Sequence, residues 1–262
     1  MIPSSSPHTM KSLRLLTALA LASLAARAAD AGFQPIFNGK DLSGWEGNAD
    51  FWSVRDGAIT GQTTAEKTTK GNTFLVWKGG KPSNFELRAR FRLTAQNDKN
   101  QANSGIQYRS KVLDAATFVV GGYQADIDST GKYAGMLYEE RGRGILMSPG
   151  QTIRVSAPDA AAVTAAQADK KAKGKAKAKV EVLGTATKPE EILAAYKLGE
   201  WNELRIVANG QRLQHYLNGK LSADVTDTDP AAGAKDGVIA LQLHQGPPMT
   251  IQFKDVQLKT LP

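Results

Sequence analysis

The sequence predicts an all-β fold: a two-sheet antiparallel β-sandwich of jelly-roll type, with one short helix and one low-complexity insertion. Short segments of alternating apolar and polar residues recur along the chain, with the period of two that is typical of a strand with one buried face. Turn-forming pairs separate them, and helical periodicity is almost absent. Many short strands with few helices favour two packed sheets, and a barrel is the alternative.

The clearest alternation lies in residues 85–93, where five apolar residues share one face and four charged residues, beginning with Glu86, share the other. Residues 123–127 and 239–243 repeat the pattern. Further strands are predicted at 52–60, 104–110, 134–140, 202–208, 213–217 and 251–258. The predicted turns between them include Asp56-Gly57, Asn209-Gly210, Asn218-Gly219 and Asp236-Gly237.

Two segments depart from this pattern. A short helix is predicted at 190–196, because Pro189 suits a first helical turn and Glu190 and Glu191 follow it. A Lys/Ala-rich insertion occupies about residues 157–180. Like charges repel and alanine buries little surface, so we expect a disordered loop or a frayed helix there.

Residues 1–28 have the features of a cleaved signal peptide. Lys11 and Arg14 precede a short apolar run at 15–24, and Ala26 and Ala28 supply small residues before the expected cleavage site. The apolar run is too short for an ordinary transmembrane helix, although a retained anchor is the alternative. We therefore expect a single domain at 29–262 in a periplasmic or secreted protein.

Composition narrows the partners and the chemistry. The net charge of +8 falls to about +1 without the signal peptide and the insertion, so no nucleic-acid partner is expected. No cysteine is present, which excludes thiol catalysis. The chain also lacks a GxSxG elbow, a P-loop and a dinucleotide-binding motif. The oligomeric state is not determined by these features.

Polar residues on predicted strand faces are the candidate site residues. Gln124, Asp126 and Asp128 share one face, and stacked carboxylates repel unless a cation, sugar hydroxyls or a shared proton offset the repulsion. We expect Asp126 to be functional and Asp128, beside a Ser-Thr-Gly turn, to be structural. His244 shares the polar side of its strand with Gln242 and can act as a base or a metal ligand.

Two further predictions concern pairs of side chains, and a third concerns a metal site. Alternation places Glu139 on the same side as Arg141, and Gln107 with Arg109 as a hydroxyl-binding pair. Asp126, Glu139 and His244 together have enough O and N ligands for one divalent metal ion. No HExxH motif supports that ligand set, so the metal ion stays open.

Seven segments together resemble a known family. They are IFNGKDLSGW at 36–45, WSVRDG at 52–57, FELR at 85–88, NSGI at 103–106, GYQAD at 122–126, WN at 201–202 and HYLNG at 215–219. In this order they resemble the 3-keto-disaccharide hydrolase domain family over about residues 33–258. The resemblance implies a concanavalin-like, laminarinase-like jelly roll acting on glycosides oxidised at C3. Many members carry Tyr-Glu-x-Gln where this chain has Tyr123-Gln-Ala-Asp126.

A 3-keto group acidifies the C2 hydrogen, so a base can start an elimination that water addition converts into net hydrolysis. The resemblance and the residues together lead us to expect His244 as base or metal ligand, Asp126 and Glu139 as ligands or acid, and His215 as second-choice base. The expected substrate-binding residues are Gln107, Arg109, Gln124, Arg141, Glu86, Tyr138 and Gln242.

Two other functions stay open at this point. A carbohydrate-binding module would expose aromatic rings as stacking platforms, whereas the four tryptophans are expected in the core. A structural envelope protein would use the lysine-rich insertion for adhesion. An enzyme would keep its activity without that insertion.

Overall fold

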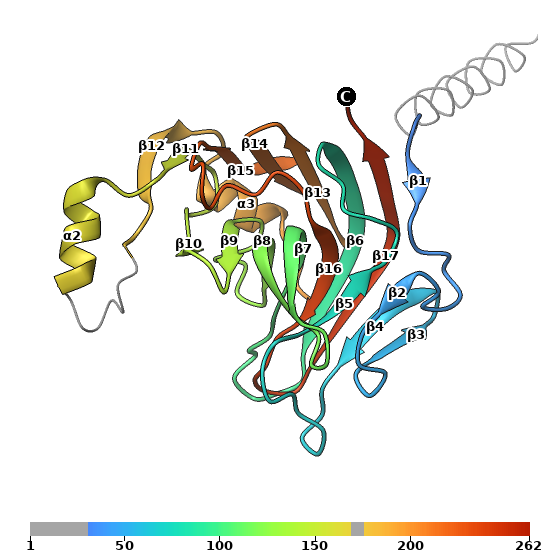
Figure 1. The fold of residues 1–262 in the computed structure, drawn as a ribbon. Coiled ribbons are helices and arrows are strands. Elements are labelled where there is room, and N and C mark those ends of the chain that lie inside the picture. Colours follow the sequence, from blue (N-terminus) through green and yellow to red (C-terminus); the bar gives the residue numbers. More distant parts are fainter. Residues whose placement is uncertain (1–30, 169–175) are drawn as a thin grey trace, which may run out of the picture. The chain divides into compact units, whose positions relative to one another are not determined.

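Two β-sheets packed face to face make up the part of the chain that carries the predicted strands (Figure 1). The computed structural model describes residues 31–168 and 176–262, and residues 34–262 form one unit. The predicted signal peptide at 1–28 lies outside the described residues. Within the described residues, no helix is both long and apolar enough to cross a membrane.

The larger sheet has ten strands. In spatial order they are β12 (Lys179–Thr185), β11 (Gln151–Ser156), β15 (Lys220–Asp227), β14 (Arg212–Leu217), β13 (Asn202–Asn209), β6 (Phe85–Ala95), β17 (Met249–Thr260), β4 (Ala58–Gln62) and β3 (Trp52–Arg55), with β1 (Gln34–Pro35) beside β17. Neighbouring strands of this sheet are antiparallel, except β11 and β15, which are parallel.

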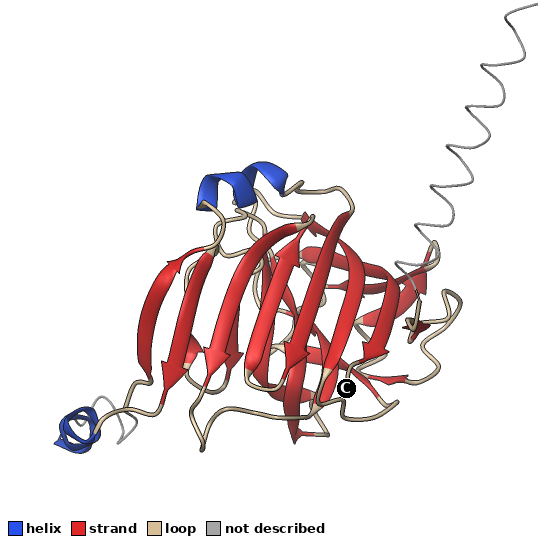
Figure 2. Ribbon diagram, turned by 90° about the horizontal axis from the view of Figure 1, so that it is seen from above, coloured by secondary structure: helices blue, strands red, loops and turns tan. Residues whose placement is uncertain are grey.

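The smaller sheet has seven strands. Their order is β10 (Gly144–Ile145), β9 (Leu137–Glu140), β8 (Val119–Asp128), β7 (Asn103–Asp114), β16 (Val238–Leu243), β5 (Thr73–Trp77) and β2 (Trp45–Glu46), all antiparallel. Figure 2 shows strands running side by side in the two layers, with the helices outside them. The predicted all-β sandwich is confirmed.

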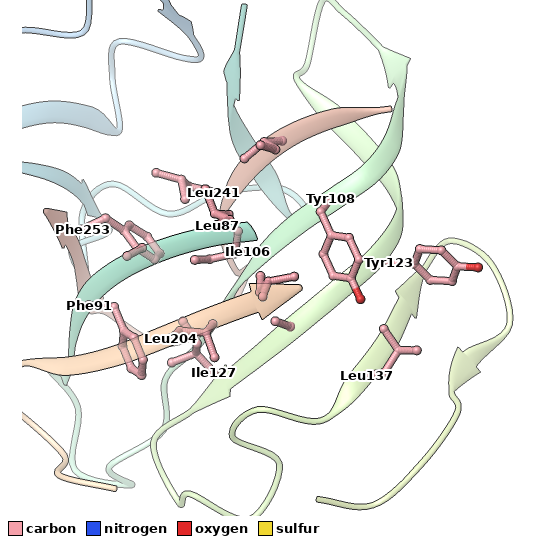
Figure 3. Packing of buried hydrophobic residues seen from close by; sticks show 14 of the residues in the cluster. Leu87, Phe91, Ile106, Tyr108, Tyr123, Ile127, Leu137, Leu204, Leu241 and Phe253 are labelled. Carbon is pink, nitrogen blue, oxygen red and sulfur yellow. The ribbon is translucent and has the colours of Figure 1, made fainter. Parts of the chain in front are cut away.

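The core lies between the sheets and is built from the apolar residues of the alternating strands. Leu87 and Phe91 of β6 face Ile106 of β7 and Ile127 of β8, and each is fully buried (Figure 3). Burying side chains of this size contributes roughly 1.5–3 kcal/mol each. The period of two in β6 and β8 therefore has the expected cause.

Strand β5, which the alternating pattern does not predict, lacks the period of two. Residues 73–77 of β5 read Thr-Phe-Leu-Val-Trp, an apolar run without alternation. Leu75 packs in the main core, while Phe74 and Val76 belong to a second cluster on the other face of the sheet. Both faces of β5 are therefore buried, which removes the polar positions on which the prediction depends.

The helices also differ in part from the prediction. α3 (Pro189–Ala195) confirms the predicted helix at 190–196. A second helix, α2 (Ala160–Ala168), occupies part of the Lys/Ala-rich insertion. Alanine has the highest helix propensity, and the Asp159 carboxylate accepts a hydrogen bond from the Ala162 amide at 2.8 Å, capping the first turn.

The hairpin of β7 and β8 reaches across the seven-stranded sheet. Its ladder shifts register between Tyr108 and Lys111 and again between Val112 and Asp114. At its end, the Phe74 amide on β5 donates to the Phe118 carbonyl at 3.1 Å. Because β7 and β16 lie between β8 and β5 in the sheet, this contact means that the hairpin end folds over the outer face. The hairpin end therefore covers the neighbouring residues on the outer face of the seven-stranded sheet.

Candidate functional site

A cavity of about 610 Å³ opens on the outer face of the seven-stranded sheet. Its wall is made by β7, β8, β9 and β16 together with the loops that follow β9 and β16. The lining residues are mostly polar: Asn72, Asn103, Gln124, Asp126, Tyr133, Met136, Tyr138, Glu139, Glu140, Arg141, Gly142, Gly144, Ile145, Gln242, His244 and Gln245. A cavity of this size and polarity suits a hydroxyl-rich ligand.

Three glutamine side chains form a buried chain of amides beneath this cavity. Gln107 Nε2 donates to Gln124 Oε1 at 2.8 Å, and Gln124 Nε2 donates to Gln242 Oε1 at 3.4 Å. All three glutamines are at most 1 % exposed. Ser110 Oγ donates to Gln107 Oε1 at 2.7 Å and extends the chain under the hairpin. Buried amides whose hydrogen bonds are satisfied keep one geometry, so these glutamines hold the side chains bonded to them in place.

Asp126 is bonded to the middle amide of this chain. Gln124 Nε2 donates to its Oδ1 at 2.8 Å, and Asn103 Nδ2 donates to its Oδ2 at 3.2 Å. Burial raises the pKa of Asp126 to about 7, and the nearby carboxylates of Asp128 and Glu140 add to the rise. Near neutral pH this carboxyl can therefore take up or release a proton, as a general acid or base must.

Glu140 supplies a second carboxylate on the same face. Its Oε2 accepts hydrogen bonds from Gln242 Nε2 at 3.2 Å and Asn72 Nδ2 at 3.3 Å, and its Oε1 lies 3.5 Å from Arg141 Nε. Because Gln242 also accepts from Gln124, one chain of side chains links Glu140 to Asp126.

Tyr138 and His244 complete the groups that can carry a proton. Tyr138 is the ladder partner of Gln124, and burial together with the Glu140 and Asp126 carboxylates raises its pKa above the ordinary value. It therefore stays a hydrogen-bond donor at neutral pH. His244 follows β16 at the edge of the cavity, and its Nδ1 pairs with the Gln245 carbonyl. A carbonyl only accepts, so Nδ1 carries the hydrogen and Nε2 is an acceptor in the neutral ring.

The structure brings together Asp126, Gln124, Tyr138, Gln242, Arg141 and His244 from the predicted set. Asp128 serves the adjoining turn, as expected, since its carboxylate accepts from Thr130 and from the Tyr133 amide.

The predicted pairing of Glu139 with Arg141 is wrong. Glu139 is the ladder partner of core-facing Tyr123, so its side chain points inward and pairs with Arg143. Arg141 pairs with Glu140 instead. The strand ends at Glu140 and Arg141 has φ 58°, so alternation does not extend across it. Glu139 therefore lacks the free carboxylate that an acid or a metal ligand needs.

The predicted pairing of Gln107 with Arg109 is also wrong. Arg109 sits at the register shift of β7 with φ 45°, so the two side chains part. Its guanidinium donates to the carbonyls of Ser83 at 2.8 Å and Gly210 at 2.7 Å. Arg109 is a structural clamp on these loops, and Gln107 acts through Gln124.

Glu86 and His215 lie away from the cavity. Glu86 is on the outer face of the ten-stranded sheet, where it pairs with Arg88 and Arg205. His215 is fully buried in the core between Tyr108 Oη, 2.7 Å from Nε2, and the Gly135 carbonyl, 3.1 Å from Nδ1. Burial lowers the pKa of His215 to about 4. Neither residue can reach a ligand in the cavity.

The predicted ligand set does not fit a metal ion. Glu139 lines the cavity, but its carboxylate is paired with Arg143, which leaves Asp126 and His244 of the set. Among residues 31–168 and 176–262, no group of three or more His, Asp and Glu side chains is placed to hold one. The Asp126 oxygens already accept from Gln124 and Asn103.

Glu140, Asn103 and Asn72 are the site residues that the sequence analysis missed. Glu140 could have been identified from the sequence. The apolar Leu137 faces the core, and residues two apart in a strand share a face, so Glu139 points inward and Glu140 outward. Asn103 stands in a segment already noted for the family resemblance. Asn72 precedes β5, and no pattern in the sequence marks it.

The fold and the cavity define a jelly-roll protein with a polar site suited to saccharides. Residues 32–259 match the 3-keto-alpha-glucoside-1,2-lyase-like domain, and the chain belongs to this carbohydrate-active family. No curated protein matches the chain.

Similar solved structures include two proteins of Parabacteroides distasonis ATCC 8503 described as glycosyl hydrolases. One is 18% identical with a TM-score of 0.52, over 87% of this chain and 99% of that one. The other is 19% identical with a TM-score of 0.51, over 89% and 96%. The carbohydrate-binding module CBM66 from Bacillus subtilis is 16% identical with a TM-score of 0.48, over 83% and 96%. The first two likenesses show a shared fold.

Proposed function

We propose that this protein cleaves 3-keto-glycosides by removing the proton at C2 and expelling the glycosidic oxygen from C1. The observation that supports this most directly is the buried Asp126 carboxyl, whose pKa of about 7 suits proton transfer near neutral pH. Membership of the 3-keto-alpha-glucoside-1,2-lyase-like family supports the 3-keto sugar as the substrate.

The reaction balances in two stages. The C3 ketone acidifies the C2 hydrogen, Asp126 takes that proton, and the electron pair moves onto the ketone oxygen as an enolate. The enolate then re-forms the ketone and a C1–C2 double bond, while the glycosidic oxygen leaves with the bonding pair and takes up a proton. Water adds its hydroxyl at C1 and a hydrogen at C2, so the net result is hydrolysis.

The other side chains of the cavity bind and polarise the substrate in this proposal. Tyr138 keeps its proton at neutral pH and donates a hydrogen bond to the oxygen on which charge develops. Glu140, Arg141 and Gln242 hold sugar hydroxyls, as carboxylate, guanidinium and amide groups do. His244 accepts a hydrogen bond through Nε2 at the edge of the cavity.

An isotope experiment tests this mechanism. The protein is incubated with a 4-nitrophenyl 3-keto-glucoside carrying deuterium at C2, and nitrophenol release and the label in the sugar are followed. We expect slower release than from the unlabelled compound, a product without deuterium, and no cleavage of the intact glucoside. A control with labelled 3-keto-glucose measures exchange from the product alone.

Three results would change the proposal. Release with the label retained would mean direct hydrolysis. No release with saturable binding would mean a carbohydrate-binding module without chemistry. Release that EDTA abolishes would restore the metal ion, because the described residues lead us to expect activity in EDTA.

We also propose export to the periplasm or the medium, on the basis of residues 1–28.

A further inference from the structure

A second cavity of about 460 Å³ adjoins the one that holds Asp126. The two share one wall, residues 139–142, which belong to the end of β9 and the turn after it. The opposite wall of the second cavity comes from the β7–β8 hairpin and from residues 231–236. A ligand that extends past Glu140 from the first cavity therefore enters the second.

Four cationic residues line this second cavity: Arg109, Lys111, Arg141 and Lys235. The Arg109 guanidinium is bonded to the Ser83 and Gly210 carbonyls, which leaves the other three for a ligand. Lys111 is the ladder partner of Gly121. A Cβ built on Gly121 would lie 3.2 Å from the Cβ of Arg141, so Lys111 and Arg141 flank this glycine from opposite sides. Lys235 contributes a third cation from the loop before β16.

The carboxylates of the second cavity, Glu139, Glu140 and Asp236, are fewer than its cations. Within the described residues, no carboxylate lies within 4.0 Å of the Nζ atom of Lys111 or of Lys235. Arg141 meets Glu140 at 3.5 Å through Nε alone. Of the other two carboxylates that line the cavity, Glu139 pairs with Arg143, and Asp236 is exposed beside the Arg109 charge.

We propose that the second cavity binds an anionic group, a uronate carboxylate or a phosphate ester, on the unit joined to the 3-keto sugar through the scissile oxygen. This inference rests on the proposed function. Glu140 and Arg141 line both cavities, so the other charged groups make the difference: Asp126 repels an anion from the first cavity, while Lys111 and Lys235 attract it into the second. The two charge patterns together orient the substrate, with the neutral 3-keto unit at Asp126.

Binding is measured by titration calorimetry with three 3-keto disaccharides that differ only at C6 of the second sugar, which carries a hydroxymethyl group, a carboxylate or a phosphate ester. The Asp126→Asn variant is used so that the ligands are not consumed. We expect the anionic ligands to bind about tenfold more tightly than the neutral one, since hydrogen bonds between charged groups are stronger than those between neutral groups. The advantage should shrink as NaCl is raised.

A matched pair of double variants locates the effect. Lys111→Met with Lys235→Met should remove the advantage of the anionic ligands and leave the affinity for the neutral ligand unchanged. Lys99→Met with Lys197→Met removes the same charge from exposed lysines that line neither cavity, and should keep the advantage. A preference for only one of the two anions would identify its source.

Three results would overturn the subsite. They are equal binding of all three ligands, an advantage of the anionic ligands that survives loss of Lys111 and Lys235, and no binding of any ligand. Cleavage by the unaltered protein separates this result from the proposed function. Cleavage of the neutral disaccharide without an anion preference refutes only the subsite. An anion preference that requires the two lysines, without any cleavage, refutes only the enzyme.

Discussion

The outer faces of the two sheets carry similar side chains and differ in what covers them. On the ten-stranded sheet, Glu86, Arg88 and Arg205 exchange ion pairs while their side chains stay 15–30% exposed. On the seven-stranded sheet, Gln107 and Gln124 are at most 1% exposed. Both sets occupy the polar positions of alternating strands.

The difference comes from the hairpin end and loops that lie over only one of these faces. The β7–β8 hairpin end packs Val120 against Phe74 and Val238, which excludes water beside the amide chain. In that environment the Asp126 carboxyl loses hydration and its pKa rises. Alternation therefore identifies the outward side chains, and the cover determines which of them acquire unusual chemistry.

Removing one carboxylate from each face should give the largest contrast. We expect Asp126→Asn to lower kcat/KM on a 3-keto-glucoside by about 10²–10⁴-fold, since an amide cannot accept the C2 proton. Glu86→Gln should stay within about twofold, because its ion pairs lie on the other sheet. Equal losses in the two variants would remove the assignment of the site to the seven-stranded sheet.

The same two variants should differ in the pH dependence of stability. The folded pKa of Asp126 is raised to about 7, so the folded state binds the extra proton and loses stability as pH rises from about 4 to 7. Between pH 4 and pH 8 the unfolding free energy should fall by about 4 kcal/mol more in the parent than in Asp126→Asn.

Urea denaturation at the two pH values measures this difference. Glu86→Gln should keep the pH dependence of the parent. His215 titrates in all three proteins, and its contribution cancels in the comparison. If Asp126→Asn followed the parent, Asp126 would not be the buried titrating group.

Of the two carboxylates compared, Asp126 and Glu86, only Asp126 should make the activity depend on pH. A base must be ionised, so kcat/KM should rise about tenfold per pH unit up to about 7 and then level off. Glu86→Gln should give the same profile. A profile without this rise would contradict Asp126 as the base, and the residual activity of Asp126→Asn should not show it.

The smallest effect concerns two strand glycines. In β7, a Cβ on Gly105 would meet Gln124 Cδ at 2.5 Å, whereas Gly184 in β12 has nothing within 4 Å. We expect Gly105→Ala to lower kcat/KM about fivefold by displacing the amide that holds Asp126. Gly184→Ala should not change kcat/KM. An unaffected Gly105→Ala enzyme would show that the amide chain is not needed for positioning.

Much of the fold could be predicted because the strands with one polar face keep their period of two. β6, β8 and β16 lie where that period predicts them, whereas β5 has two buried faces and no period to detect. The site was predictable in part. Asp126, Gln124 and Gln242 follow from alternation. Alternation continued through Arg141 selects Glu139 over Glu140, whereas the strand ends before Arg141.

The sequence by itself determined the sandwich, since burial of one face per strand is a local property of the chain. It also marked Asp126 as a carboxylate on an outward face. The cover over this face arises from the tertiary structure. So do the link from Asp126 through Gln124 of β8 and Gln242 of β16 to Glu140, and the scaffold roles of Arg109 and His215. Those contacts link residues up to 118 positions apart, and desolvation depends on what the fold places over a side chain.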